Sequence, residues 1–119
     1  METKRITLSI IIVHYKVKNE LFDCLDSIEK SKSKTSYEII VVDNDEEESI
    51  EKELKKKFTL VHYVKSSGNI GYGSGNNLGA RFAKGEFLFF LNPDTKVLLR
   101  CIDSLVDFIR KDKKIGVDR

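Results

Sequence analysis

Apolar runs and polar breaks follow one another along this chain in a pattern that predicts strands alternating with helices. Four short apolar runs, rich in β-branched or aromatic residues, are typical of buried strands. We expect these strands at residues 6–15, 37–42, 60–64 and 87–91. The first run has so few polar residues that it predicts a strand covered on both faces.

The segments after these strands carry apolar residues at helical spacing. Leu21, Leu25 and Ile28 give the first helix one apolar face, and Asn19 is a suitable N-cap residue. We expect further helices at residues 47–57, at about 74–84 and around Ile102, Leu105, Val106 and Ile109. Ile115-Gly116-Val117 is typical of the start of another element. Strand and helix alternating with short loops predict an α/β fold, with parallel strands joined by right-handed crossovers.

Polar residues come directly after three of the predicted strands. They are His14-Tyr15-Lys16, Asp43-Asn44-Asp45 and Asn92-Pro93-Asp94. In an open parallel sheet, ligands bind outside the carboxyl ends of the strands. The strand order 3-2-1-4 would bring all three clusters into one crevice, so we expect a binding site at this edge.

A glycine-rich segment, GNIGYGSGNNLG, spans residues 68–79. Gly73, Gly75 and Gly79 fit GxGxxxG, a loose relative of dinucleotide-binding fingerprints. Those fingerprints follow the first strand of their unit, whereas these glycines follow the third, so the context does not fit. Two interpretations stay open: a close-packed helix start, or a place where the backbone approaches an anionic ligand at a helix N-terminus.

Asp94 also has two interpretations. An Asp after a strand is often a turn former, and Pro93 suits a turn. Together with Asp43 and the glycine-rich helix start, Asp94 favours a metal site. Mg²⁺ or Mn²⁺ binds carboxylate oxygen, keeps water ligands and completes its shell with substrate phosphates, so one protein carboxylate can suffice.

Composition narrows the function classes further. The 119 residues are 40% hydrophobic and 34% charged, with a formal net charge of +2 that indicates no particular partner. Lys55-Lys56-Lys57 predicts a solvated helix face rather than a nucleic-acid surface. Cys24 and Cys101 match no metal or disulfide pattern, and we expect both to be reduced core thiols of a cytosolic protein. Residues 1–5 lack the pattern of a secretory signal, so we expect none before the first strand.

Three blocks of sequence resemble the family 2 glycosyltransferases with the GT-A fold. They are IIIVHYK, IIVVDND and NIGYGSGNNLGARFAKGEFLFFLNPDT, in that order, and the likeness runs from Ile6 to about Val117. The NPDT form of the metal motif is similar to that of the rhamnosyltransferase-like branch. The resemblance implies a single partial domain over residues 1–119: the Rossmann-like, nucleotide-binding half of the fold, with a mostly parallel sheet flanked by helices.

The resemblance also implies residue roles. His14 and Tyr15 would border the nucleotide base, and Asp43 would bind it. Asn69, Gly71 and Asn76 would lie by the nucleotide and its sugar. Asp94 would hold Mn²⁺ or Mg²⁺, with Asn92 as a weaker ligand or a supporting group. Two residues depart from the family pattern: Lys16 replaces a usual Asn, and Asp45 precedes an acidic run.

The implied reaction is inverting transfer of a sugar from a dTDP- or UDP-sugar to a glycan or lipid-linked acceptor. The family places its acceptor region and general base after the metal motif, so we expect both outside this chain. The alternative is a nucleotide- and metal-binding module without transferase activity. We expect a cytoplasmic location, at most at the inner face of the membrane, no nucleic-acid partner, and self-association through the sheet edge formed by the fourth strand.

Overall fold

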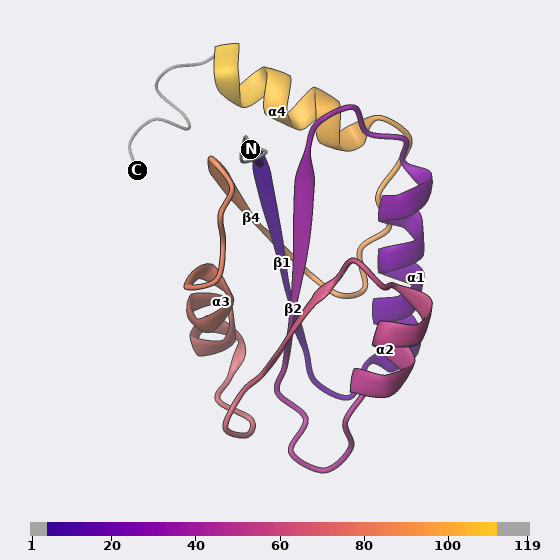
Figure 1. Ribbon diagram of the computed structural model, residues 1–119, viewed down its shortest axis with the longest axis vertical. Coiled ribbons are helices and arrows are strands. Elements are labelled where there is room, and N and C mark those ends of the chain that lie inside the picture. Colours follow the sequence, from indigo (N-terminus) through magenta and orange to yellow (C-terminus); the bar gives the residue numbers. More distant parts are fainter. Residues whose placement is uncertain (1–4, 112–119) are drawn as a thin grey trace, which may run out of the picture.

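The computed structural model describes residues 5–111, and within them a parallel sheet is flanked by helices (Figure 1). The strands are β1 (Leu8–His14), β2 (Tyr37–Asp43), β3 (His62–Lys65) and β4 (Phe87–Leu91). The helices are α1 (Lys18–Lys30), α2 (Glu51–Lys57), α3 (Tyr72–Ala80) and α4 (Cys101–Lys111). The sheet order is β3-β2-β1-β4 with every pair parallel, which confirms the predicted α/β fold and strand order.

The central strand β1 is buried along its whole length, as its sequence predicts. Alternate side chains of a strand point to opposite faces of the sheet. Leu8, Ile10 and Ile12 therefore join the larger core, and Ile11 and Val13 join a smaller one. In Figure 1, α1 and α2 lie on one side of the sheet and α3 on the other, with α4 across the end where β1 begins.

The larger core lies between the sheet and the helices α1, α2 and α4. Leu21, Leu25 and Ile28 of α1 are buried in this core, and these are the residues whose spacing predicted an apolar helix face. From α4, Ile102 and Val106 are buried in the same core. The end of the sheet where the strands begin, the closed edge, is thus covered by α4. The other end, where the carboxyl ends of the strands lie, is the open edge.

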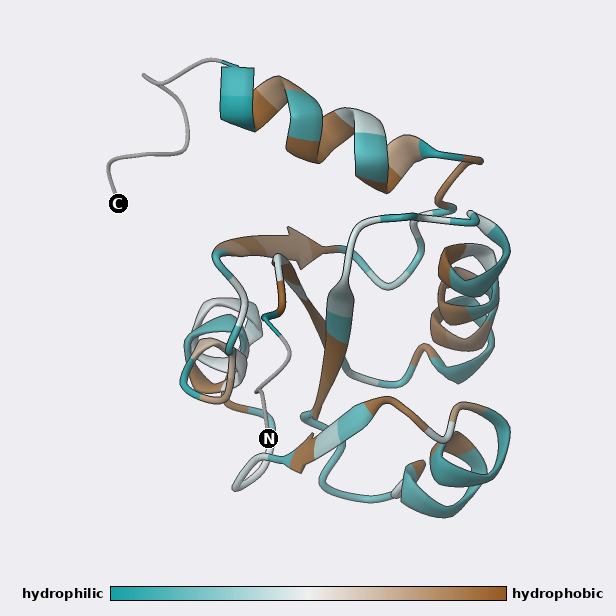
Figure 2. Cartoon of the chain, turned by 45° about the horizontal axis from the view of Figure 1, so that its top comes forward, coloured by the Kyte–Doolittle hydropathy of each residue, from teal (hydrophilic) through white to brown (hydrophobic). Residues whose placement is uncertain are grey.

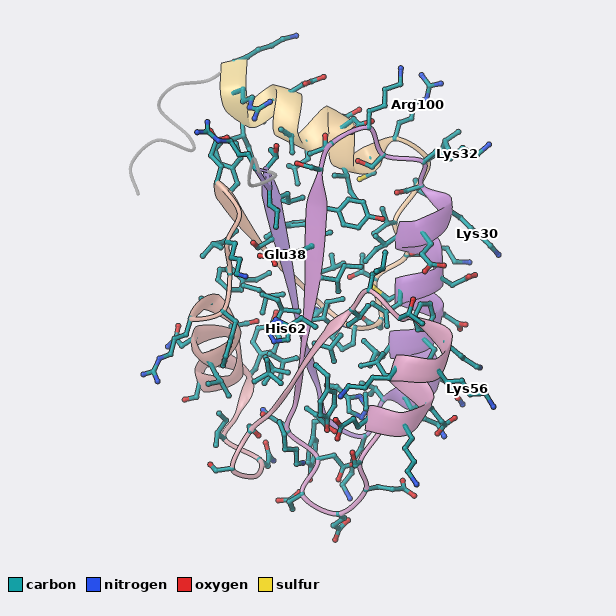
Figure 3. The ribbon with its side chains drawn as sticks, in the orientation of Figure 1. Lys30, Lys32, Glu38, Lys56, His62 and Arg100 are labelled. Atoms are coloured by element: carbon teal, nitrogen blue, oxygen red, sulfur yellow. The ribbon has the colours of Figure 1, made fainter. Side chains whose placement is uncertain are left out.

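The start of β4 is held by a polar contact across the sheet. The Ser9 hydroxyl donates to the Glu38 carboxylate at 2.6 Å, and the Lys84 N–H donates to the same carboxylate. Glu38, labelled in Figure 3, comes from β2. A Cβ atom at Gly85 would lie 2.7 Å from the Ser9 backbone nitrogen, so glycine is required where the chain enters β4.

Several expected boundaries are wrong by a few residues. The helix predicted at 47–57 begins at Glu51, and the one predicted at 74–84 runs over Tyr72–Ala80. The third strand starts at His62 rather than at residue 60. The first helix begins at Lys18, before Asn19, and Val17 at its N-cap provides no side-chain hydrogen bond. The element expected at Ile115 lies outside the described residues.

Two expectations about burial need correction. Cys24 is buried, as predicted, but Cys101 is exposed because it begins α4 on the side facing away from the core. The strand β4 is not buried on both faces: Leu88 and Phe90 are 46% and 43% exposed. They lie on the α3 face of the sheet, where α3 packs mainly against β1 and β2. Across residues 5–111, no helix has the length and apolarity needed to span a bilayer.

Candidate functional site

The polar residues that follow β1 and β2 are brought side by side at the open edge of the sheet. His14 is directly opposite Asp43 in the parallel pairing of the two strands. On the other side of β1, Leu91 pairs with Ile12, so Asn92 and the turn after it leave the sheet at the same edge. The strand order thus brings together the three clusters that sequence analysis selected.

His14 is an almost completely buried histidine at the end of β1, 1% exposed. Its Nδ1 atom has no hydrogen-bond partner among the described residues. Burial lowers the pKa of His14 below 6.5, and the nearby carboxylates of Asp43 and Asp45 oppose this shift only in part. Near neutral pH the imidazole is therefore uncharged, and its buried Nδ1 atom is left without a protein partner.

Asp43 is fully buried, and its carboxylate is used inside the protein. It accepts hydrogen bonds from the Tyr63 hydroxyl at 2.6 Å and the Asp45 N–H at 3.0 Å, with the Ile50 N–H at 3.5 Å. Burial, together with this bond, raises the pKa of Tyr63 to about 12. Asp43 thus joins β3 to the loop that follows β2.

Asp45 shapes the same loop. Its carboxylate accepts from the Glu47 N–H at 3.0 Å and the Glu48 N–H at 3.2 Å, which lowers its pKa. The Lys65 ammonium of β3 donates to the Asp45 carbonyl. These bonds give residues 45–50 a fixed non-helical course, which explains why α2 starts late.

A cavity of about 550 Å³ opens between this loop and the start of α1. It is lined by His14, Lys16, Lys18, Asn19, Glu20, Asp45, Glu47, Glu48 and Ile50. Lys16 forms an ion pair with Glu47 across the cavity, and Lys18 forms one with Glu53 of α2 at 2.9 Å. Lys16 has φ of 57°, a left-handed conformation that Asn adopts more readily than Lys.

Sequence analysis did not predict most of this cavity. Lys16 and Asp45 were expected only as departures from the family pattern and Asn19 only as a helix N-cap, and no role was predicted for Lys18 or Glu47. The available signal was the acidic run at residues 46–48, which follows a strand end and has basic residues to pair with at 16 and 18. Tyr15, predicted here, is 39% exposed at the end of β1 and does not line the cavity.

The glycine-rich segment forms a second wall of the open edge. Gly71, at φ of 86°, precedes α3, and its carbonyl accepts from the Asn44 amide at 3.0 Å. The Asn69 side chain accepts from the Gly71 N–H at 3.2 Å. Asn76 is buried, and its side-chain oxygen has no partner among the described residues. The N-terminus of α3 therefore opens at the same edge of the sheet as His14.

Asn92 and Asp94 lie in an exposed turn after β4, which the Thr95 N–H closes by donating to the Asn92 carbonyl at 3.1 Å. None of the ion pairs within residues 5–111 involves Asp94. The same residues contain no group of three or more His, Cys, Asp or Glu side chains placed to hold a metal ion. The turn after β4 thus carries one exposed carboxylate, Asp94, which suits a hard cation that is held mainly by its substrate.

Comparison with known proteins gives a family for this arrangement. The family model "Glycosyl transferase family 2" matches residues 9–118. A hexosyltransferase of low-salt glycan biosynthesis, Agl10 of Haloferax volcanii, is 35% identical over 96 residues, covering 76% of this chain and 28% of its own length. An uncharacterized glycosyltransferase of Haemophilus influenzae is 30% identical over 109 residues, or 92% of this chain and 36% of its own length.

A poly(ribitol-phosphate) beta-glucosyltransferase of Bacillus spizizenii is 34% identical over 92 residues, with 73% of this chain and 14% of its own length covered. The crystal structure of S. aureus TarS 1-349 in complex with UDP superposes with a TM-score of 0.75 at 20% identity, over 89% of this chain and 32% of that one. A complex of the same fragment with UDP-GlcNAc gives 0.73 at 21%. The chain thus spans between 14% and 36% of the length of its curated relatives.

Proposed function

Because this chain belongs to glycosyl transferase family 2, we propose that it is the donor-binding part of an enzyme that moves a sugar from a nucleotide-diphospho-sugar to an acceptor hydroxyl, with inversion. One observation carries the proposal. Three features lie together at the open edge, each after one of the neighbouring strands. They are a cavity lined by a buried imidazole without a partner, a glycine-rich helix start, and an exposed Asp. Residues 1–119 then form a single partial domain.

The nucleotide base is proposed to bind at the end of β1. The neutral His14 imidazole has a nitrogen without a partner, and hydrogen bonding to the base would satisfy it. Tyr15, half-exposed beside it, provides an aromatic surface at the same end of the strand. Asp43 supports this end of the site mainly by holding the loop after β2, since its carboxylate already accepts the bonds described above.

The diphosphate is proposed to bind at the N-terminus of α3. Backbone N–H groups of the first turn have no acceptor within the helix, and the helix dipole favours an anion there. Gly73 leaves open space where a side chain would stand, so the approach to this turn is unobstructed. Asn69, Gly71 and Asn76 then lie by the nucleotide and its sugar.

Asp94, with Asn92 beside it, is the residue that would hold Mn²⁺ or Mg²⁺. Its carboxylate is exposed, and a hard cation can complete its shell with diphosphate oxygens and water. Such a cation would stabilise the negative charge that develops on the leaving diphosphate. The protein's own contribution is to place that carboxylate next to the end of β1, the strand that also carries His14.

A UDP-sugar is the donor that we favour. The support comes from the UDP and UDP-GlcNAc complexes of the structural neighbour and from the hexosyl- and glucosyltransferase relatives. A dTDP-sugar such as dTDP-rhamnose is the second choice, supported by the NPDT form of the motif at residues 92–95. The acceptor is a glycan or a lipid-linked glycan. We extend the proposal to a cytoplasmic site of action, which suits the free, buried thiol of Cys24.

The alternative is a binding module that holds nucleotide and metal but transfers nothing. It is supported by the carboxylates of α4, which lie away from the open edge. Asp103 is fully engaged by the loop before β2, where it accepts from Ser33, Lys34 and Thr35. We therefore assign no general base among the α4 carboxylates of the described residues, and the proposed enzyme takes its base from elsewhere in the protein.

Calorimetric titration of the chain tests the donor site. UDP, dTDP and GDP are titrated with Mn²⁺ and then with EDTA present. We expect one nucleotide to bind in a metal-dependent way, and Asp94→Asn to weaken that binding about tenfold or more and to remove its metal dependence. Asp107→Asn, an exposed carboxylate on α4, is the matched control and should bind as the unaltered chain does. Binding that is equal with Mn²⁺ and EDTA, or absent for all three nucleotides, would contradict the proposal.

A further inference from the structure

A polar cavity of about 880 Å³ lies at the closed edge of the sheet, between α4 and the loop that joins α1 to β2. The cationic side chains that line it are Lys32, Lys34, Arg100 and Arg110. Arg110 pairs with Glu86 at 3.2 Å. The other three cations take part in none of the ion pairs within residues 5–111, so they are free to bind an anion.

Two acidic residues also line this cavity, but they do not cancel its charge. The Asp103 carboxylate is turned toward the loop, where it accepts from the Thr35 hydroxyl at 2.6 Å and from the Lys34 N–H at 2.9 Å. Asp107, further along α4, is the other acidic residue. Four cations against two carboxylates leave the lining positive, with Asp107 as its one carboxylate that is not held by the loop.

The backbone at two of the cations is strained in the same way. Lys32 and Arg100 have φ of 53° and 61°, in the left-handed region that favours glycine. Lys32 comes directly after the C-cap residue of α1, which is the usual position of a glycine. The Arg100 N–H donates to the Ser31 carbonyl at 2.9 Å, so the two left-handed residues lie on either side of one hydrogen bond. Strain of this kind indicates a function for the side chains that impose it.

Two leucines project next to this cavity. Leu98 and Leu99 directly precede Arg100 and are 68% and 62% exposed. Their segment is fixed to α1 at both ends, because the Val97 N–H donates to the Ser27 hydroxyl at 2.8 Å and the Arg100 N–H is bonded as described above. The leucines are therefore held at the surface. Figure 2 shows the loop that leads into α4 as hydrophobic, at a corner of the molecule.

Cations lie on the other side of the leucines as well. Lys30 and Lys96 line a smaller cavity of about 430 Å³ together with the two leucines. The acidic residues of that cavity are Asp23 and Asp26, and Asp26 pairs with Lys30 at 2.9 Å. Exposed apolar residues between cations are typical of a surface that binds at the interface of an anionic membrane.

We propose that this corner is a membrane-docking surface, which binds the phosphate head group of an anionic phospholipid in the larger cavity and inserts Leu98 and Leu99 among the lipids. Lys32, Lys34 and Arg100 donate to the phosphate oxygens, and such charge-assisted bonds are strong. A phospholipid is favoured over a soluble phosphate compound because only a bilayer removes the leucines from water.

The position of this corner leaves the donor site uncovered. Lys30, Lys32 and Arg100 lie together where α1 ends and α4 begins (Figure 3). The cavity lined by His14 lies at the start of α1, at the open edge. A chain docked through the corner can therefore still bind a nucleotide, and the inference does not rest on the proposed function.

Cosedimentation with vesicles tests the proposal with the full chain. We expect binding to vesicles of phosphatidylglycerol and phosphatidylcholine in equal parts, and far weaker binding to phosphatidylcholine alone. Lys32→Gly should weaken binding about fivefold, the effect of one cation at an anionic membrane. Because glycine relieves the strained backbone, this substitution should not lower the temperature of thermal unfolding.

Lys56→Gln is the matched control, since it removes an exposed lysine from α2, away from the corner (Figure 3). It should leave vesicle binding unchanged. Equal weakening by Lys32→Gly and Lys56→Gln would overturn the proposal, and so would a chain that does not bind the anionic vesicles.

Leu99→Ser tests whether the leucines enter the bilayer. It should weaken vesicle binding about tenfold because less apolar surface is buried. Leu60→Ser, at a leucine that is 94% exposed between α2 and β3, should have no effect. If Leu99→Ser bound vesicles as the unaltered chain does, membrane docking would be wrong, and the cavity would serve a soluble phosphate compound.

Competition tests the head-group site. Inorganic phosphate should displace the chain from the anionic vesicles more effectively than chloride at the same ionic strength, because both screen charge but only phosphate fits the cavity. Equal displacement by the two anions would overturn the assignment of the cavity to a phosphate head group.

Discussion

At the scale of single residues, the most constrained group in the candidate site is the Asp43 carboxylate. It is fully buried, and a buried charge is tolerated only when hydrogen bonds replace its lost water. The Tyr63 hydroxyl is the one side-chain donor in its set, and backbone N–H groups supply the others. The loop that lines the cavity therefore depends on a tyrosine from a different strand.

Tyr63→Phe removes this donor and leaves a buried carboxylate short of one bond. We expect the free energy of unfolding to fall by about 2 kcal/mol, as for loss of a hydrogen bond to a charged group. Urea unfolding at pH 7 measures the change. Tyr37→Phe is the matched control, because Tyr37 is also a partly buried tyrosine at a strand and its hydroxyl makes no hydrogen bond within residues 5–111. Equal losses for both substitutions would contradict a specific role for Tyr63.

At the scale of elements, α3 packs closely on the sheet through two glycines one turn apart. A Cβ atom at Gly79 would lie 2.6 Å from Ile11 Cγ2 and 3.0 Å from Val42 Cγ2. At Gly75 it would lie 2.9 Å from Val13 Cγ1 and 3.2 Å from the Asn44 amide nitrogen. The glycines thus set how near the N-terminus of α3 lies to the end of β1, which is where the donor is proposed to bind.

Gly79→Ala should lower the free energy of unfolding by about 1–3 kcal/mol, because the added methyl group overpacks the smaller core. Thermal unfolding followed by circular dichroism measures this loss. Gly73→Ala in the same helix has open space around its Cβ atom and should cost nothing, since Ala favours helix more than Gly does. If Gly79→Ala were as stable as Gly73→Ala, close packing of α3 would not be what requires glycine at residue 79.

Elements were predictable from the sequence where burial dictates the pattern, and less so where polar contacts do. The runs at β1 and β2 are apolar because both faces are covered, so their type and order were clear. The start of α2 was misplaced because the Asp45 carboxylate holds the Glu47 and Glu48 N–H groups outside the helix. The cavity at Lys16 depends on contacts between residues some thirty positions apart, such as Lys16 with Glu47, which no local pattern indicates.

At the scale of the whole molecule, polar contacts at the two ends of the sheet respond to pH in succession. His14 lies at the open edge, and burial lowers its pKa. Asp103 lies at the closed edge, where hydrogen bonds from Thr35, Lys34 and Ser33 hold its pKa far below 3.8. Both groups resist protonation in the folded state and accept protons when the chain unfolds, so stability falls as the solution becomes acidic.

As the pH falls, stability is lost first through His14 and then through Asp103. This order follows from the pKa values of the two groups in the unfolded chain. Below about 6.5 an unfolded His14 is protonated while the folded one is not, so the first loss begins there and continues to the lowered folded value. The contribution of Asp103 is fully present above about 3.9, the ordinary pKa of an unfolded Asp, and is lost as the pH falls toward its depressed folded value. The first loss therefore reports on the open edge and the second on the contact of α4 with the loop before β2.

Urea unfolding between pH 7.5 and 3 separates the two. His14→Gln should flatten the dependence of stability on pH just below 6.5 and leave the steeper loss near pH 4 in place. Asp103→Asn should do the reverse, and it should also lower stability at pH 7 by about 1–2 kcal/mol because it weakens the bonds to residues 33–35. His62→Gln, on the opposite face of β3 from Tyr63, is the matched control for loss of an imidazole. A slope below pH 6.5 that persists in His14→Gln would show that the buried imidazole is not its source.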